Sequence, residues 1–262
     1  MLLILYVDDA CIISPNDHSI TKEIESLKQE YDLTDDGDLL DYLGTRFTRK
    51  SDGSVLLTQP RMVDRILKII GFDKLDENVT KHDTPATTIL DNDPEGKPRQ
   101  QNWHYRSVVG CLSYLQAMVR PDLTFAVQQC SRFCEKPDKS HEEAVKRICR
   151  YLLKTRHEGL LLKPDINRGL ECHVDADWAG AWTHRSSNDL SSTYSQSGYC
   201  ITYAGCPLLW KSRLQSIIAL SSTEAEYIAL STALRDVIAI IQLLRELESN
   251  GIKVHKVTPK IV

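Results

Sequence analysis

The stretch Leu2-Leu3-Ile4-Leu5-Tyr6-Val7-Asp8-Asp9-Ala10-Cys11-Ile12-Ile13 places two adjacent aspartates between two apolar runs. Apolar runs on both sides of a short polar break are typical of a β-hairpin, so Asp8 and Asp9 are predicted at its tip. Carboxylates held this close repel each other unless a cation lies between them, and Mg²⁺ prefers oxygen ligands of this kind. Aspartate is also common in ordinary turns. The dipeptide therefore has two interpretations, a metal site and a plain turn.

Composition indicates a folded chain that stays inside the cell. Of the 262 residues, 26% are charged and 42% are hydrophobic, which is enough for two modest domains. The net charge of −4 means that any contact with nucleic acid must come from a local basic face. The eight cysteines include no C-x-x-C pair, which favours reduced thiols in an intracellular protein. No apolar run approaches the roughly 20 residues of a membrane span, so no membrane partner is expected.

The hydrophobic periodicity predicts an α+β protein. Helical spacing appears at residues 20–31, 60–71, 105–119, 123–134 and 141–154. Strands are predicted at residues 39–49, 55–58, 160–162, 170–174, 198–203 and 208–211. A long helix follows at 223–247, and its residues predicted to face inward are Ile228, Leu234, Ile238, Ile241 and Leu244. Between 73 and 102 the periodicity disappears among prolines and polar residues, which indicates a mobile surface linker.

One predicted helix, 141–154, carries its positive charges on a single face. The four basic residues are Lys146, Arg147, Arg150 and Lys154, and apolar residues lie on the other side of the helix. Such a face is either an ordinary solvated surface or a surface that follows the phosphates of a nucleic-acid duplex. It would position a polynucleotide without reading its sequence.

Several strings together resemble a known family. Tyr6-Val7-Asp8-Asp9 between apolar strands resembles the catalytic hairpin of reverse transcriptases. Further strings resemble, in the same order, the Pol polyprotein of copia-type retrotransposons: Tyr42-Leu43-Gly44, Tyr105-Arg106-Ser107-Val108-Val109-Gly110, Arg120-Pro121-Asp122, Lys146-Arg147-Ile148-Cys149-Arg150-Tyr151-Leu152, Asp175-Ala176-Asp177-Trp178-Ala179-Gly180 and Ala219-Leu220-Ser221-Ser222-Thr223-Glu224-Ala225-Glu226-Tyr227.

The resemblance implies four regions. Residues 1–72 correspond to the end of a reverse-transcriptase palm, 73–102 to a linker, 103–158 to a helical thumb or connection region, and 159–262 to the first part of a ribonuclease H-like α/β domain. The chain is thus expected to be truncated at both ends relative to the family.

The family's ribonuclease H cuts the RNA strand of an RNA–DNA hybrid with two metal ions held by four carboxylates. The resemblance matches the opening-strand carboxylate to Asp175. Asp177 is a rival because it lies on the same strand face. The carboxylate at the start of the first helix matches Glu224, although Ser221-x-x-Glu224 is also a capping-box pattern. The resemblance therefore assigns Asp8, Asp9, Asp175 and Glu224 as catalytic metal ligands.

The complete parent is expected to be an RNA-directed DNA polymerase with ribonuclease H activity and Mg²⁺ or Mn²⁺ as its cofactor. The expected partners are a template–primer duplex or RNA–DNA hybrid and the remainder of the Pol polyprotein, in a cytoplasmic particle or the nucleus. The remaining carboxylates of both metal sites are expected outside residues 1–262, so the isolated chain is expected to be inactive. Two alternatives are a non-catalytic nucleic-acid-binding remnant and a degenerate transposon reading frame.

Overall fold

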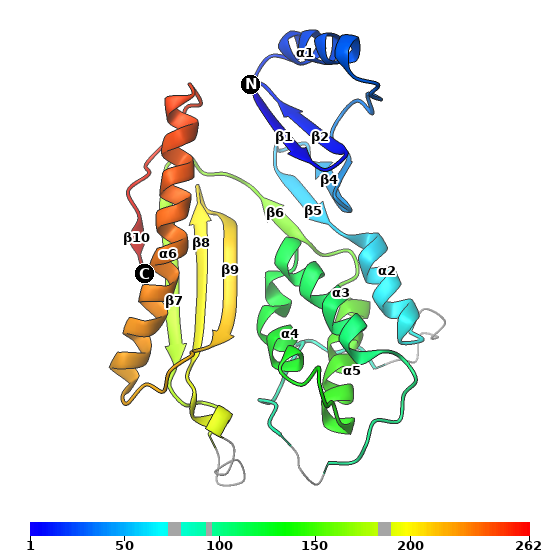
Figure 1. Ribbon diagram of the computed structural model, residues 1–262, viewed down its shortest axis with the longest axis vertical. Helices are drawn as coiled ribbons and strands as arrows, with labels where there is room; N and C mark the ends of the chain where they lie inside the picture. Colours follow the sequence, from blue (N-terminus) through cyan, green and yellow to red (C-terminus); the bar gives the residue numbers. More distant parts are fainter. Residues whose placement is uncertain (73–79, 93–95, 183–189) are drawn as a thin grey trace.

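The N-terminal stretch forms the predicted hairpin. In the computed structural model, which describes residues 1–72, 80–92, 96–182 and 190–262, β1 (Leu2–Tyr6) and β2 (Asp9–Ile13) pair antiparallel as a sheet of two strands (Figure 1). Tyr6 pairs with Asp9, so the turn consists of Val7 and Asp8. Val7 has a φ of 52°, a left-handed conformation that is rare for a β-branched residue. The hairpin tip is therefore a strained two-residue turn.

The helix after the hairpin, α1 (Asp17–Glu30), begins three residues earlier than predicted. The side chain of Asn16 accepts a hydrogen bond from the backbone N–H of His18 at 3.0 Å. Asparagine at this position satisfies one of the free N–H groups of the first turn. No residue of α1 is buried, so local capping defines this helix more than packing does.

A second sheet combines distant parts of the chain. Its order is β3 (Asp41–Tyr42), β4 (Thr45–Arg49), β5 (Val55–Thr58) and β6 (Leu160–Leu162), all antiparallel. The sequence reading ends the helical region at 158 and puts 160–162 in the ribonuclease H-like part. The hydrogen bonds place β6 beside β5, in the same sheet as β3 and β4.

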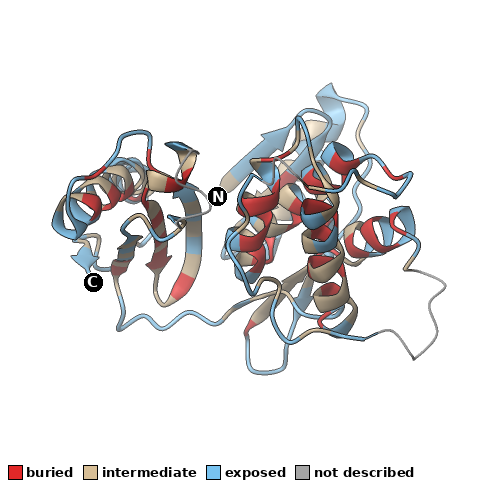
Figure 2. Ribbon diagram, turned by 90° about the horizontal axis from the view of Figure 1, so that it is seen from below, coloured by how far each residue is buried: buried red, intermediate tan, exposed pale blue. Residues whose placement is uncertain are grey.

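The helices between these strands enclose the larger core. They are α2 (Pro60–Ile69), α3 (Tyr105–Met118), the short 3₁₀ helix η1 (Pro121–Leu123), α4 (Thr124–Ser131) and α5 (Lys139–Lys154). Pro60 occupies the first turn of α2, and Gly71, with φ of 80°, follows its end, as the sequence predicts. Figure 2 shows the buried residues of these helices as one group and those of the C-terminal part as another.

The C-terminal part is a four-stranded sheet covered by one long helix. Its strands are β7 (Leu170–Asp177), β8 (Gln196–Tyr203), β9 (Cys206–Leu214) and β10 (Lys260–Ile261), with the 3₁₀ helix η2 (Leu190–Thr193) before β8 and α6 (Ser222–Ser249) between β9 and β10. The order is β10-β7-β8-β9, and β10 runs parallel to β7 while the other pairs are antiparallel. The last strand thus returns beside the first (Figure 1).

Helix α6 packs on this sheet through small residues. Its buried positions are Ala225, Ala229, Ala233, Val237 and Leu244, and the last three share one core cluster with Leu170, Cys172 and Ile201 of the sheet. The prediction that Ile238 faces inward is wrong, since its side chain is 54% exposed. Among the described helices, α6 alone has the length and hydropathy to cross a membrane. Because the helix is apolar on several sides, hydrophobicity alone does not reveal which face meets the sheet.

The described parts of the predicted linker contain no helix or regular strand, and hydrogen bonds attach them to the helices. Residues 73–79 and 93–95 of this prediction lie outside the described part of the chain. The carboxylate of Glu142, only 1% exposed, accepts hydrogen bonds from the backbone N–H groups of Gln100 and Gln101 at 3.2 Å. Further along, the backbone N–H of Leu90 donates to Gln129 at 3.1 Å. These contacts hold the segment against α4 and α5.

A buried arginine joins three helices of the larger core. The Arg120 side chain is 2% exposed and binds Asp122 through Nε at 3.0 Å and through Nη2 at 2.7 Å. It also donates to the carbonyl and the hydroxyl oxygen of Thr155, at 3.1 and 2.7 Å. Tyr151 donates from its hydroxyl to Asp122 at 2.9 Å. These charge-assisted hydrogen bonds, together with the aromatic face of Tyr151, offset the cost of burying the Arg120 charge.

Removing Asp122 should therefore destabilise the fold. Asp122→Ala leaves the Arg120 charge buried without its carboxylate, and we expect the free energy of unfolding to fall by about 1.5–3 kcal/mol. Urea denaturation followed by circular dichroism measures this. Asp64→Ala is the matched control because its ion pair with Arg156 is exposed, so little change is expected there. Equal losses in the two variants would contradict the role given to Arg120.

Candidate functional site

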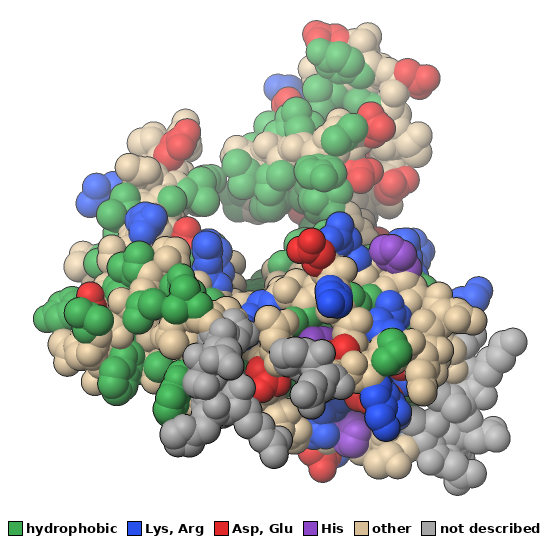
Figure 3. Space-filling view, turned by 60° about the horizontal axis from the view of Figure 1, so that its bottom comes forward, with side chains coloured by type: hydrophobic (Ala, Val, Ile, Leu, Met, Phe, Trp, Pro, Cys, Tyr) green, Lys and Arg blue, Asp and Glu red, His purple; other side chains and the backbone are tan. Residues whose placement is uncertain are grey.

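The first pair of predicted ligands lies at the tip of the β1–β2 hairpin. Asp8 and Asp9 are both exposed, and the side chains of Leu5, Tyr6 and Val7 beside them are 68%, 59% and 87% exposed. Figure 3 shows hydrophobic surface over this N-terminal region, which lies faint at the top of the view. The structure thus brings the two aspartates together on a strained turn but surrounds them with uncovered apolar side chains.

The second predicted position lies on β7. Alternation along the strand puts Leu170, Cys172 and Val174 on the face covered by α6. Asp175 and Asp177 alternate to the opposite face and are exposed. Asp175 stands opposite Gly198, which offers no side chain. Asp177 lies over the following turn, where any side chain at position 180 would collide with its carboxylate.

The third predicted position, Glu224, takes part in capping the N-terminus of α6. The hydroxyl oxygen of Ser221 accepts a hydrogen bond from the backbone N–H of Glu224 at 3.1 Å, and the Glu224 carboxylate accepts one from the N–H of Leu220 at 2.7 Å. The two hydrogen bonds form a variant of the capping box, in which the glutamate accepts from the residue before the N-cap and not from the N-cap itself. Glu224 also lines a cavity of about 410 Å³ together with Lys211 and Arg213. Asp175 is not among the residues that line this cavity.

A carboxylate that the sequence reading did not assign lies closer to the C-terminal strand. Glu226 lines a groove of about 440 Å³ with Val174 of β7 and with Ile261 and Val262 at the end of β10. Strand β7, the first turn of α6 and the end of β10 therefore converge at Glu226. In the sequence, Thr223-x-x-Glu226 is a second capping pattern. Glu226 lies two residues after Glu224, and this spacing puts the two side chains on different faces of the helix.

The carboxylates that the structure describes do not complete a metal site. Within residues 1–72, 80–92, 96–182 and 190–262, no three His, Cys, Asp or Glu side chains gather closely enough to hold a metal ion. Mg²⁺ is commonly held in near-octahedral geometry by one or two carboxylates together with water and substrate phosphates, so the residues present supply at most part of such a site.

The predicted basic face of α5 exists, but its cations have partners within the protein. Lys146 pairs with Glu142 at 2.8 Å and with Glu143 at 2.9 Å. The remaining partners are Thr84 for Arg147, Glu143 for Arg150 and Asp83 for Lys154. These contacts neutralise part of the positive charge. A phosphate contact on the outer face of α5 would thus compete with acidic and hydroxyl groups of the same chain.

Comparison with known proteins decides the family. Over 257 residues, 94% of this chain, it is 33% identical to the retrovirus-related Pol polyprotein from transposon TNT 1-94 of Nicotiana tabacum. It is 31% identical over 250 residues to the retrovirus-related Pol polyprotein from transposon RE1 of Arabidopsis thaliana. The chain belongs to the Pol polyproteins of copia-type retrotransposons. It spans only 18% and 16% of the length of these two relatives.

A shorter relative carries a different name. This Pol segment is 40% identical over 138 residues to the secreted RxLR effector protein 161 of Plasmopara viticola, an alignment that covers 53% of the segment and 92% of that protein. No family model matches the Pol segment, and no solved structure matches it.

The two glutamates of α6 should differ in their effect on stability. Glu224→Ala removes a hydrogen bond at the helix start, and we expect it to lower the free energy of unfolding by about 1 kcal/mol. Glu226→Ala removes no such bond and should cost clearly less. Thermal and urea denaturation of both variants measure the difference. If Glu226→Ala proves the more costly, the capping role assigned to Glu224 is wrong.

Proposed function

We propose that this Pol segment connects the end of an RNA-directed DNA polymerase domain to the first part of a ribonuclease H-like domain in the complete polyprotein. Its substrates there are a template–primer duplex and an RNA–DNA hybrid, and Mg²⁺ or Mn²⁺ is the cofactor of the complete protein. The parent acts inside the cell, without a membrane partner. The observation that carries the proposal is the placement of acidic residues on the C-terminal sheet and its helix.

That placement follows the order that the family resemblance implies. The opening strand of the sheet, β7, carries Asp175 and Asp177, and the first turn of the first helix, α6, carries Glu224 and Glu226. The next strand, β10, ends in the groove that Glu226 lines. A carboxylate placed just after β10 in the complete polyprotein would lie closer to Glu226 than to Glu224. Asp175 and Asp177 remain alternatives, because both lie on the same face of β7.

The N-terminal hairpin supports the polymerase half of the proposal. A two-residue turn holds Asp8 and Asp9 at the end of two paired strands, which keeps both carboxylates at one fixed point. The exposed apolar side chains on both strands offer a surface for further strands of the same polyprotein. In the proposal, the rest of the palm covers this surface and supplies the missing ligand.

The chain alone is proposed to be inactive, because its described carboxylates do not gather into a metal site. Incubation of residues 1–262 with an RNA–DNA hybrid and either Mg²⁺ or Mn²⁺ is expected to give no cleavage above a protein-free control. Turnover that Asp175→Asn abolishes would contradict this expectation.

The chain spans less than a fifth of the length of these relatives, so the parent function is tested in a longer Pol polyprotein segment that contains residues 1–262. Such a segment is expected to cleave the hybrid, and replacing a true metal ligand is expected to lower the rate by orders of magnitude. Asp175→Asn, Asp177→Asn, Glu224→Gln and Glu226→Gln compared in this segment identify the ligands. Asp165→Asn, on a loop before β7, is the matched control. If none of the four variants lowers the rate more than the control does, the proposed site is wrong.

A further inference from the structure

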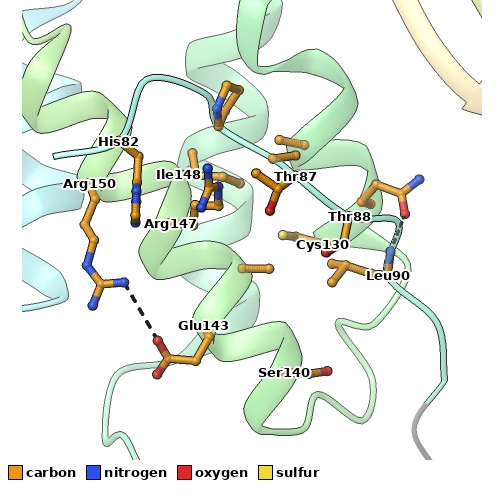
Figure 4. A pocket seen from close by; sticks show the side chains of 15 residues that line it. His82, Thr87, Thr88, Leu90, Cys130, Ser140, Glu143, Arg147, Ile148 and Arg150 are labelled. Atoms are coloured by element: carbon orange, nitrogen blue, oxygen red, sulfur yellow. Dashed lines mark hydrogen bonds and ion pairs between the residues drawn. The ribbon is translucent and has the colours of Figure 1, made fainter. Parts of the chain in front are cut away.

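A cavity of about 390 Å³ lies away from the carboxylates, between residues 82–90 and helices α4 and α5. Its volume is within the range of about 300–1,000 Å³ that is usual for small-molecule sites. Its apolar lining includes Ala126, Ala144 and Ile148 of the two helices and Pro85 and Ala86 of the segment 82–90. Figure 4 shows the segment that begins at His82 crossing over the two helices. The cavity therefore has room for an organic group as well as an ion.

Basic side chains gather at one end of this cavity. His82, Arg147 and Arg150 all line it, and in Figure 4 the ring of His82 lies between the two arginine side chains. Burial lowers the pKa of His82, and the nearby charges of Arg147 and Arg150 lower it further, against a smaller opposing effect of Asp83. The potential at this end is thus positive even when His82 is neutral.

The acidic group that lines the cavity does not cancel this charge. Glu143 lies 3.9 Å from Arg150, but its carboxylate also pairs with Lys146 at 2.9 Å. Lys146 also pairs with the buried carboxylate of Glu142 at 2.8 Å, so Glu142 and Glu143 balance the charges of Lys146 and Arg150, and Arg147 adds a further positive charge. An anion that enters the cavity would meet a net positive environment.

Arg147 has an unused hydrogen-bond donor. Its Nη2 donates to the hydroxyl oxygen of Thr84 at 3.0 Å. Its Nε is buried and has no hydrogen-bond partner among the residues that the structure describes. A buried, charged N–H group without an acceptor is costly, and an oxygen supplied by a ligand would remove that cost. The guanidinium fork is suited to an oxyanion with several acceptor oxygens.

We propose that this cavity binds a phosphomonoester, with the phosphate at Arg147, Arg150 and His82 and the organic group along the apolar lining. A phosphate dianion offers three acceptor oxygens, which matches several donors converging from two elements. The hydroxyls of Thr87 and Thr88, which also line the cavity, are available to the ligand's polar atoms. The source is either a free mononucleotide or the 5′-phosphate end of a nucleic-acid strand. This site does not depend on the proposed catalytic function.

Binding by the full 262-residue chain tests the proposal. Isothermal titration calorimetry with adenosine 5′-monophosphate and with adenosine compares the same organic group with and without the phosphate. The same comparison uses a short single strand with a 5′-phosphate and one with a 5′-hydroxyl. We expect the phosphorylated member of at least one pair to bind about tenfold or more tightly, and the pair that shows this identifies the source. Equal or undetectable binding within both pairs overturns the proposal.

Variants locate the binding site. Arg147→Gln is expected to weaken binding about tenfold, which is the loss of one charge-assisted hydrogen bond. Arg61→Gln, on the exposed face of α2, is the matched control and should bind as the original chain does. His82→Gln is a second variant in case Arg147→Gln melts at a lower temperature than the original chain. If both cavity variants bind as the control does, the phosphate does not bind in this cavity.

Discussion

The buried guanidinium of Arg120 is the interaction on which the arrangement of the rest depends. It follows the end of α3, binds Asp122 within η1 and reaches Thr155 at the end of α5. Five residues after Thr155 the chain enters β6, and β6 leads on to β7. The contacts of Arg120 fix the end of α5, and this end sets the direction in which the chain continues into the two sheets. Because the surrounding core is apolar, the guanidinium has few alternative partners, and this favours a single arrangement of the helices.

The elements with a clear local signal were predictable from the sequence. The hairpin at residues 2–13, helix α2 between Pro60 and Gly71, and helix α5 all appear as their patterns indicate. Position in the fold was harder to predict. The three leucines of β6 are apolar on both faces and carry no alternation, so nothing in them identifies β5, about 100 residues earlier, as their partner. Similarly, α6 is apolar on several sides, and its buried face combines three alanines with Val237 and Leu244.

The sequence predicted which residue types occupy the elements of the candidate site, but it did not predict how these residues lie relative to one another. The sequence indicated acidic residues on β7 and at the start of α6, and both are there. Which glutamate faces the neighbouring strand depends on where β10 returns, and a pairing across more than 80 residues leaves no local signal in α6. The basic residues of α5 were also correctly grouped. Their partners Asp83 and Thr84 come from a segment without periodicity, so their neutralisation was invisible in the sequence.

The pairing of β6 with β5 has a consequence for how the polypeptide reaches its native state. The strands β4 and β5 lie next to each other in sequence and can pair as soon as both have been synthesised. Their sheet is complete only after residue 162 has been made, because its last strand follows all the helices of the larger core. Closing such a long loop is entropically costly and slow. During translation the early strands therefore present an open edge until the ribosome has passed the helical region, and this interval is when the nascent chain is most exposed to misassembly.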